Sequence, residues 1–280
     1  MASETSDETK GPSGRVLIVA GSDSGGAAGI QADIKSVTAL GGYAMTAITA
    51  VTAQNTLGVH GVWPLPLEAV FAQFDVTFAD LGADAIKTGL LGPTPLIEGL
   101  AERFYGPAAK VAKVIDPVMI ASSGQRLLEA GAIDAIRSLL VPGATLVTPN
   151  APEAEILTNK PVETVDGQRR AAERLLEAGA LGALVKGAHV EGDVIIDVLQ
   201  THEGEWLFEG PRLRTRADHG TGCTLASSTA AQIALGDDVP TAVERARDFL
   251  RGGLEHAQPL GSGRGPVNHA WRVQQGWENG

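Results

Sequence analysis

The first segment that could support chemistry is glycine-rich and spans residues 21–29, with the sequence GSDSGGAAG. It follows an apolar run typical of a buried strand and precedes a helical stretch. Glycines let the backbone approach a ligand closely, and the start of a helix favours an anion or another polar group. The spacing matches neither the dinucleotide-binding fingerprint nor a P-loop. The segment therefore indicates either a ligand-binding loop or a tight turn between a strand and a helix.

A second glycine-rich segment, HGTGCT at residues 219–224, opens another predicted helix. Four consecutive backbone amides would converge at the positive end of this helix, those of Gly220, Thr221, Gly222 and Cys223. Such an anion hole suits the charge that develops on a phosphoryl group during transfer. Cys223 would lie in the first turn, where the pKa of a thiol tends to be lowered. The alternative is a small buried cysteine at a glycine-rich helix start.

Two carboxylates and an amide also follow predicted strands. Asn150 and Glu153 are three residues apart at a helix start, so both side chains would lie on one side of the first turn and could orient a hydrated Mg²⁺. Asp116 directly follows a strand and precedes a proline that keeps the backbone extended, where it could bind Mg²⁺ or its water. The structural alternatives are a capping box for the pair and a turn-forming Asp-Pro for Asp116.

Two lysines, Lys87 and Lys186, come after predicted strands as well. A lysine at such an edge can neutralise phosphate as a point charge, although an ordinary solvated side chain is the commoner case for any single lysine. The six histidines form no cluster with metal-ligand spacing, which argues against zinc. An anion hole, two carboxylates, an amide and lysines at one sheet edge are what magnesium-assisted phosphoryl transfer without a P-loop requires.

The elements that must position these residues alternate between strands and helices. Apolar runs predict strands at 15–20, 43–51, 84–87, 111–115, 145–147 and 183–185, and a hairpin over 194–200 and 205–209. Helical patterns follow the first glycine-rich loop to about residue 40 and lie at 67–81, 95–104, 130–140, 165–178, 221–235 and 240–257. This alternation implies a mainly parallel sheet that binds ligands beyond the carboxyl ends of its strands. We expect one α/β domain over residues 15–270, between tails at 1–14 and 271–280.

The composition narrows the function classes further. The chain has 280 residues, with 22 Lys and Arg against 33 Asp and Glu, so its formal net charge is −11. This acidic balance and the low aromatic content argue against binding to a nucleic acid backbone. A single cysteine excludes a disulfide scaffold, and no apolar stretch is long enough for a membrane helix. Residues 1–14 lack the apolar core of a signal peptide, so we expect a cytoplasmic protein that binds small molecules.

Many of these motifs occur together, in this order, in one enzyme family. The chain resembles the hydroxymethylpyrimidine/phosphomethylpyrimidine kinases of thiamine biosynthesis, which belong to the ribokinase-like superfamily. The resemblance runs from about Arg15 to His269 and rests on GSDSGGAAGIQADIK, VTAQNT, KTGLL, DPVM, TPNAPEAE, LVKGAH, HGTGCTLAS and GRGPVNH. It implies a three-layer sandwich with a mainly parallel central sheet and helices on both faces, and it implies a homodimer.

The resemblance also implies an activity and a substrate pocket. Such an enzyme uses ATP and Mg²⁺ to phosphorylate 4-amino-5-hydroxymethyl-2-methylpyrimidine, and then phosphorylates the monophosphate to the diphosphate. Asp33 would accept a hydrogen bond from the amino group of the pyrimidine, and the amide of Gln54 would match a ring nitrogen. The full pocket would be formed by Gly21, Ala28, Asp33, Gln54, Leu90 and Val118.

At the phosphate end, the resemblance assigns groups to ATP and to the metal. The metal would be supported by Asp116 and Glu153, and the ATP phosphates by Lys186, Asn150, Glu153 and Thr221. Cys223 stands where most sugar kinases of the superfamily carry an aspartate base. It would therefore take the proton of the substrate hydroxyl as a thiolate, or position that hydroxyl. Phosphoryl transfer depends mostly on positioning and charge neutralisation, so a weak base suffices.

Three other functions compete with this interpretation. A pyridoxal/pyridoxine kinase would have the same fold and a cysteine in the same loop, and only Gln54 and Asp33 favour the pyrimidine. A catalytically silent ligand sensor on this fold would not need Asp116, Lys186 and Cys223, all of which are present. A nicotinamide-dependent oxidoreductase would share the parallel sheet, but its nucleotide fingerprint is missing.

Overall fold

The central feature of the computed structural model, which describes residues 14–119 and 128–273, is a single nine-stranded sheet. Its order is β3-β2-β1-β4-β5-β6-β7-β8-β9, and the neighbours from β2 to β7 pair in parallel. β3, β8 and β9 are antiparallel additions at the two edges. The strands are β1 Arg15–Asp23, β2 Tyr43–Asn55, β3 Gly58–Pro64, β4 Ala85–Thr88, β5 Ala112–Ile115, β6 Leu146–Val147, β7 Gly182–Val185, β8 Val194–Thr201 and β9 Gly204–Pro211.

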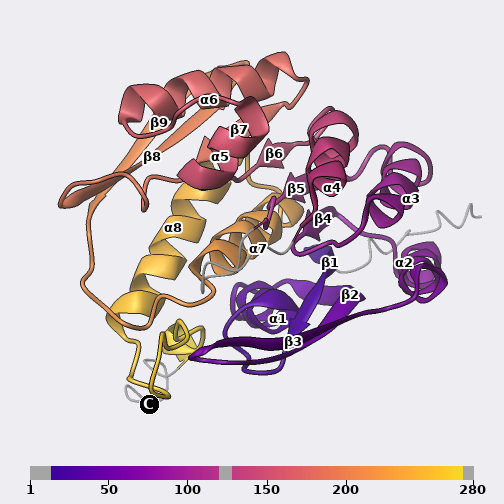
Figure 1. Cartoon of the computed structure of the whole chain (residues 1–280), viewed down its shortest axis with the longest axis horizontal. Helices are drawn as coiled ribbons and strands as arrows, with labels where there is room; N and C mark the ends of the chain where they lie inside the picture. The colour runs from indigo at the N-terminus through magenta and orange to yellow at the C-terminus, as the bar shows by residue number, and fades with distance from the viewer. Residues whose placement is uncertain (1–13, 120–127, 274–280) are drawn as a thin grey trace, which may run out of the picture.

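Helices cover both faces of this sheet, which confirms the predicted three-layer sandwich (Figure 1). One layer consists of α1 Gly29–Ala39, α7 Thr221–Ala234 and α8 Val239–Glu255. The other consists of α2 Leu67–Leu81, α3 Thr94–Tyr105, α4 Ala130–Ala135 with its π-helical continuation Ile136–Leu140, α5 Ala151–Thr158 and α6 Val165–Glu177. None of the helices in the described part of the chain is long and apolar enough to cross a membrane.

The apolar run of β1 is explained by its burial on both faces. Leu17 and Val19 pack into the core under the α2–α6 layer, whereas Val16 and Ile18 pack against α1 and α7. All four side chains are completely buried, and burying each contributes roughly 1.5–3 kcal/mol. A central strand of a parallel sheet therefore shows no polar alternation, which is why it was recognisable from the sequence.

The structure adds elements that the periodicity did not indicate. β3 is absent from the predicted strands because its sequence, GVHGVWP, contains two glycines and is mostly exposed or half-buried.

The boundaries of the folded domain differ by one residue at each end from the expected range 15–270. The carbonyl of Gly14 accepts a hydrogen bond from Tyr43 N (2.9 Å), and Trp271, expected to begin the tail, donates from Nε1 to Phe249 O (3.1 Å). The rest of both predicted tails lies outside the described residues, apart from positions 272 and 273.

A buried ion pair connects the sheet to the α1–α7 layer. Lys87, at the end of β4, donates from Nζ to Asp33 Oδ1 of α1 over 2.8 Å, and both side chains are fully buried. Ser227 of α7 donates to the same carboxylate oxygen. Burial alone would lower the pKa of Lys87, but the nearby negative groups, Asp33 foremost, raise it above its ordinary value. The solvated interpretation of Lys87 is therefore wrong, since this lysine is part of the core.

We expect Lys87→Met to lower the free energy of unfolding by about 3–5 kcal/mol, because it leaves the Asp33 carboxylate buried without a counter-charge. Urea-induced unfolding followed by circular dichroism measures the change. The double variant Asp33→Leu/Lys87→Met removes both charges and should recover most of the loss. A single variant as stable as the wild type would show that the pair is not a stabilising unit.

Candidate active site

One cavity of about 350 Å³ collects nearly all the residues singled out from the sequence. It lies beyond the carboxyl ends of β1, β4 and β5, at the amino ends of α1 and α7, with β2 and β3 as a side wall. The predicted residues that line it are Gly21, Ala28, Gln54, Leu90, Asp116, Val118, Asn150, Glu153, Lys186, Gly220, Thr221, Gly222 and Cys223. The topology of the sheet therefore brings together motifs that are up to two hundred residues apart in the chain.

Asp33 is the exception among the predicted site residues. Its side chain is fully buried and is not among the residues that line the cavity. Lys87 and Ser227 both contact its Oδ1, whereas its Oδ2 has no hydrogen-bond partner among the described residues. The structure therefore does not place Asp33 at the cavity wall, where a hydrogen bond from the substrate was expected of it. The reason is positional: Asp33 lies a full turn inside α1, on the side of the helix that packs on the sheet. A carboxylate there needs a cation in the core, and Lys87 supplies it.

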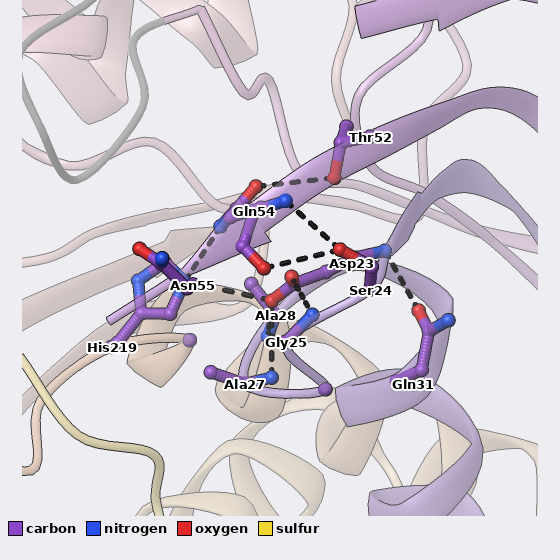
Figure 2. Close-up of polar contacts among 12 residues, drawn as sticks. Asp23, Ser24, Gly25, Ala27, Ala28, Gln31, Thr52, Gln54, Asn55 and His219 are labelled. Carbon is purple, nitrogen blue, oxygen red and sulfur yellow. Dashed lines mark hydrogen bonds and ion pairs between the residues drawn. The ribbon is translucent and has the colours of Figure 1, made fainter. Parts of the chain in front are cut away.

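The first glycine-rich loop folds around its own aspartate. Asp23 accepts hydrogen bonds from the backbone amides of Gly25 (2.8 Å), Ala27 (3.0 Å) and Ala28 (2.8 Å), as Figure 2 shows. Burial acts to raise the pKa of Asp23, but hydrogen bonds to its carboxylate, among them those from the amides of Ala28 and Gly25, leave the pKa below its ordinary value. Because Gly21 and Ala28 of this loop line the cavity, the loop is a candidate ligand-binding loop as well as a tight turn.

The second glycine-rich loop packs directly against the first. Gly220 adopts a left-handed conformation (φ 82°), and a Cβ there would collide with the carbonyl oxygen of Ala27. Only glycine meets both conditions. α7 then begins at Thr221, so the backbone amides of its first turn lack intrahelical acceptors. Gly222 and Cys223 line the cavity in this first turn, which gives the predicted anion hole its geometry.

The thiol of Cys223 does not have the lowered pKa that its helical position suggested. Burial raises the pKa of Cys223 to about 12; Lys87 opposes this rise, whereas Asp33 and Asp116 add to it. Desolvation thus outweighs the helix terminus and the Gly29 amide that also favours the thiolate. At neutral pH the side chain is a thiol rather than a thiolate, so its expected role as a thiolate base is not supported by this environment.

Opposite charges meet at the far side of the cavity. Lys186 Nζ lies 3.3 Å from Asp116 Oδ1, which also accepts a hydrogen bond from Thr148 Oγ1 (3.3 Å). The other oxygen, Asp116 Oδ2, is buried without a hydrogen-bond partner among the described residues. Burial would lower the pKa of Lys186, but Asp116 and Glu153 raise it, so the ammonium group is charged. An unsatisfied carboxylate oxygen beside a cavity is a suitable ligand for a cation.

Asn150 and Glu153 form the capping box and line the cavity at the same time. Glu153 N donates to Asn150 Oδ1 (2.9 Å), and Asn150 N donates to Glu153 Oε2 (2.8 Å). Burial raises the pKa of Glu153 to about 7, with Lys186 opposing and Asp116 adding to the rise. Asn150 and Glu153 can therefore cap α5 and also be available to a ligand in the cavity.

The oxygen atoms of Asp116 and Glu153 fit Mg²⁺, which binds few protein carboxylates and completes its shell with water and phosphate oxygens. No group of three or more His, Cys, Asp or Glu side chains that could hold a metal occurs within residues 14–119 and 128–273. Any Mg²⁺ here would therefore need water and nucleotide oxygens as its further ligands.

Several cavity residues were missed by the sequence interpretation. His219 lines the cavity and approaches Gln54, and Asp23 supports the loop beside them (Figure 2). Both belong to quoted motifs, but nothing in the spacing assigned them a role. Val59 and Val62 come from β3, which was not predicted at all. The presence of β3 is what turns an open sheet edge into a walled cavity.

A segment near the C-terminus, residues 261–265, holds the two sides of the site together. Arg264 N donates to Thr56 O (2.9 Å) in the turn between β2 and β3, while Gly265 O accepts from His219 N (3.0 Å). A Cβ at Gly263 would collide with Thr56 O. Figure 1 shows this yellow segment beside one end of β3. It connects the side wall to the loop that precedes the anion hole.

Comparison with known proteins agrees with this geometry. Residues 23–268 match the family described as phosphomethylpyrimidine kinase. A hydroxymethylpyrimidine/phosphomethylpyrimidine kinase from Streptomyces coelicolor is 46% identical over 92% of this chain and 95% of its own.

Two solved structures are similar as well. The ADP complex of Bacillus subtilis pyridoxal kinase has a TM-score of 0.86 and 32% identity, covering 94% of this chain and 100% of its own. Phosphomethylpyrimidine kinase from Clostridium difficile 630 has a TM-score of 0.76 and 35% identity, covering 85% and 97%. This chain belongs to the phosphomethylpyrimidine kinase family.

Proposed function

We propose that the protein uses ATP and Mg²⁺ to phosphorylate 4-amino-5-hydroxymethyl-2-methylpyrimidine and then its monophosphate, in thiamine biosynthesis. The observation that carries this proposal is that one cavity holds both a pocket around Gln54 and the amino end of α7, with its candidate anion hole. A kinase needs these two sites side by side, because the acceptor oxygen must meet the phosphorus in line. The family membership and the names of its relatives support the same activity.

The pyrimidine would occupy the end of the cavity near the first glycine-rich loop. Leu90 and Val118 supply apolar contacts for the flat ring, and Gln54 supplies a polar contact for its edge. Gly21 and Ala28 keep the backbone close to the ligand. A small pocket that is mostly apolar with few placed polar groups is the usual form of such a site.

The phosphate groups of ATP would lie between α7 and the charged side of the cavity. The amides of Gly222 and Cys223 face charge that develops on the transferred phosphoryl group, and Lys186 neutralises phosphate oxygens. Asp116 and Glu153 would hold Mg²⁺, with Asn150 and Thr221 beside the phosphates. When bound, Mg²⁺ would neutralise charge on the phosphates and hold them in place. These groups all act by position and charge, which is what a loose phosphoryl transfer requires.

Cys223 would position the substrate hydroxyl. Its neutral sulfur accepts a weak hydrogen bond from the hydroxyl and aims the oxygen at the phosphorus. In transfer the new O–P bond forms, the bond to the ADP oxygen breaks, and the hydroxyl proton leaves late to a phosphoryl oxygen or solvent. The second phosphorylation has a different acceptor, a phosphate oxygen that is already ionised. It therefore places no demand on a group that handles a hydroxyl proton.

The substrate assignment is tested by offering the purified protein ATP and Mg²⁺ with each of three acceptors. We expect ADP release with the hydroxymethylpyrimidine and with its monophosphate, measured by a coupled assay. Pyridoxal is the second candidate, because the B. subtilis pyridoxal kinase superimposes with a higher TM-score than the C. difficile enzyme. Turnover of pyridoxal alone would replace the proposed substrate, and absence of any turnover would favour a ligand sensor.

We expect Cys223→Ala to reduce kcat for the first phosphorylation by about 100-fold, the order of loss when a reacting group is misplaced by about 1 Å. The KM for the hydroxymethylpyrimidine should change little, because Gln54 and the loop remain. The kcat for the monophosphate should fall much less, since its acceptor oxygen carries no proton. Equal losses in both steps, measured by steady-state kinetics, would place the thiol at the anion hole common to both steps instead.

We further propose a cytoplasmic homodimer that pairs through the β2–β3 edge. Val51 and Trp63 are register partners on one face of these strands, and they are 43% and 59% exposed. An edge strand with exposed apolar side chains favours association with another chain. Light scattering should give the mass of two chains for the wild type and of one for Trp63→Glu. A wild-type mass of one chain would contradict the dimer.

A further inference from the structure

We propose that His219 is a positioning residue that fixes the side-chain amide of Gln54, so that Gln54 Oε1 faces the ligand and accepts a hydrogen bond from its amino group. This inference rests on the proposed function and names the specificity determinant of the same site. It also supplies the acceptor that was expected from Asp33, whose carboxylate is engaged in the core instead.

The contact between the two side chains leaves little choice of donor. Gln54 Nε2 lies 2.7 Å from His219 Nε2 (Figure 2), and two nitrogens at this distance need one donor and one acceptor. The amide nitrogen carries hydrogens and no acceptor lone pair, so the imidazole nitrogen must accept. In this contact His219 Nε2 therefore presents its lone pair to the amide of Gln54. Its ring thereby selects which end of the amide points away from it.

The opposite end of the amide keeps its capacity to accept. Gln54 Oε1 lies 3.4 Å from Thr52 Oγ1, but that hydroxyl has one proton and a shorter contact, 3.0 Å, with Ser22 O. The proton of Thr52 therefore goes mainly to the backbone of β1. Gln54 Oε1 is left available to a donor in the cavity that Gln54 lines. The amino group of an aminopyrimidine is such a donor, whereas a ring carbonyl is not.

Hydrogen bonds hold the backbone at both Gln54 and His219, so the orientation of the Gln54 amide depends mainly on its side-chain contacts. Ser24 Oγ accepts from Gln54 N (2.9 Å) and donates to Gln54 O (3.1 Å), so the strand cannot shift past the loop. His219 N donates to Gly265 O (3.0 Å). With both backbones fixed, rotation of the amide by half a turn is the main freedom left to Gln54.

Asp23 approaches the same imidazole nitrogen as Gln54, from a greater distance. Its Oδ2 lies 3.6 Å from His219 Nε2, beyond a good hydrogen bond, and already accepts from the amides of Ala27 and Ala28. The carboxylate is therefore occupied by the first glycine-rich loop, and His219 Nε2 is left to Gln54. The loop that contacts the substrate ring thus also influences how the ring edge is recognised.

The test compares binding of two ligands that differ at one position, the 4-amino pyrimidine and its 4-oxo analogue. Calorimetry with the full chain gives the discrimination ratio of the two dissociation constants without requiring turnover. For the wild type we expect at least 10-fold preference for the amino form, because the oxo form places an acceptor against Gln54 Oε1. For His219→Ala the amide can rotate freely, and the ratio should fall to within about 3-fold of unity.

Three further variants separate positioning from a general structural effect. Gln54→Ala should lose the preference, and His219→Ala/Gln54→Ala should bind like Gln54→Ala alone, because His219 acts through Gln54. His219→Gln, whose side-chain carbonyl can accept from Gln54 Nε2, should restore part of the preference. His202→Ala, a matched control at an exposed histidine in the β8–β9 turn, should behave as the wild type.

Additive losses in the double variant, or a His219→Ala protein that keeps the full preference for the amino form, would overturn the role of His219. The binding measurements also distinguish failure of the His219 role from failure of the proposed kinase function. Wild-type protein that binds and discriminates the two pyrimidines but transfers no phosphate would overturn the kinase assignment and leave the His219 role supported. Wild-type protein that prefers neither ligand would overturn the His219 role, whatever its kinase activity.

Discussion

The site depends above all on how closely the loop before α7 approaches the loop after β1. Gly220 lies against the carbonyl of Ala27, in a left-handed conformation and at a distance that leaves no space for a side chain. This contact brings the amino end of α7, which would hold phosphate, to the loop that would hold the acceptor. The two ends of the proposed phosphoryl transfer would thereby be placed in one cavity by the backbone alone, before any side chain contributes.

The charged groups at the site differ from the net charge of the chain. The chain carries a formal charge of −11, yet the cavity is lined by the first-turn residues of α7 and by the ammonium group of Lys186, which would face the phosphates. A second ammonium group, Lys87, lies below the cavity and balances Asp33 inside the core. Acidic side chains near the cavity, Asp116 and Glu153, are the groups suited to Mg²⁺. An acidic enzyme can therefore bind anions because the binding groups are local and the repelling charges are mostly remote.

The sequence was informative where one physical cause dominates. Continuous apolar runs such as Val16–Ala20 predicted buried parallel strands, and polar motifs after them predicted the sheet edge that carries the cavity. The sequence was misleading where opposing physical effects act on the same residue, or where a distant residue decides the outcome. The helix terminus suggested a lowered pKa for Cys223, but desolvation is the larger effect. Asp33 was assigned to the substrate because the sequence does not show that Lys87, 54 positions away, lies beside it in the core. β3 has too little apolar periodicity to be seen at all.

The segment at residues 261–265 has a consequence for how the protein folds. It connects Thr56 in the side wall to His219 before the start of α7, and it is synthesised after both of them. The side wall and the loop before α7 can therefore be joined only once this segment has left the ribosome. A chain that stops short of it would lack the contacts that hold these two sides of the cavity together.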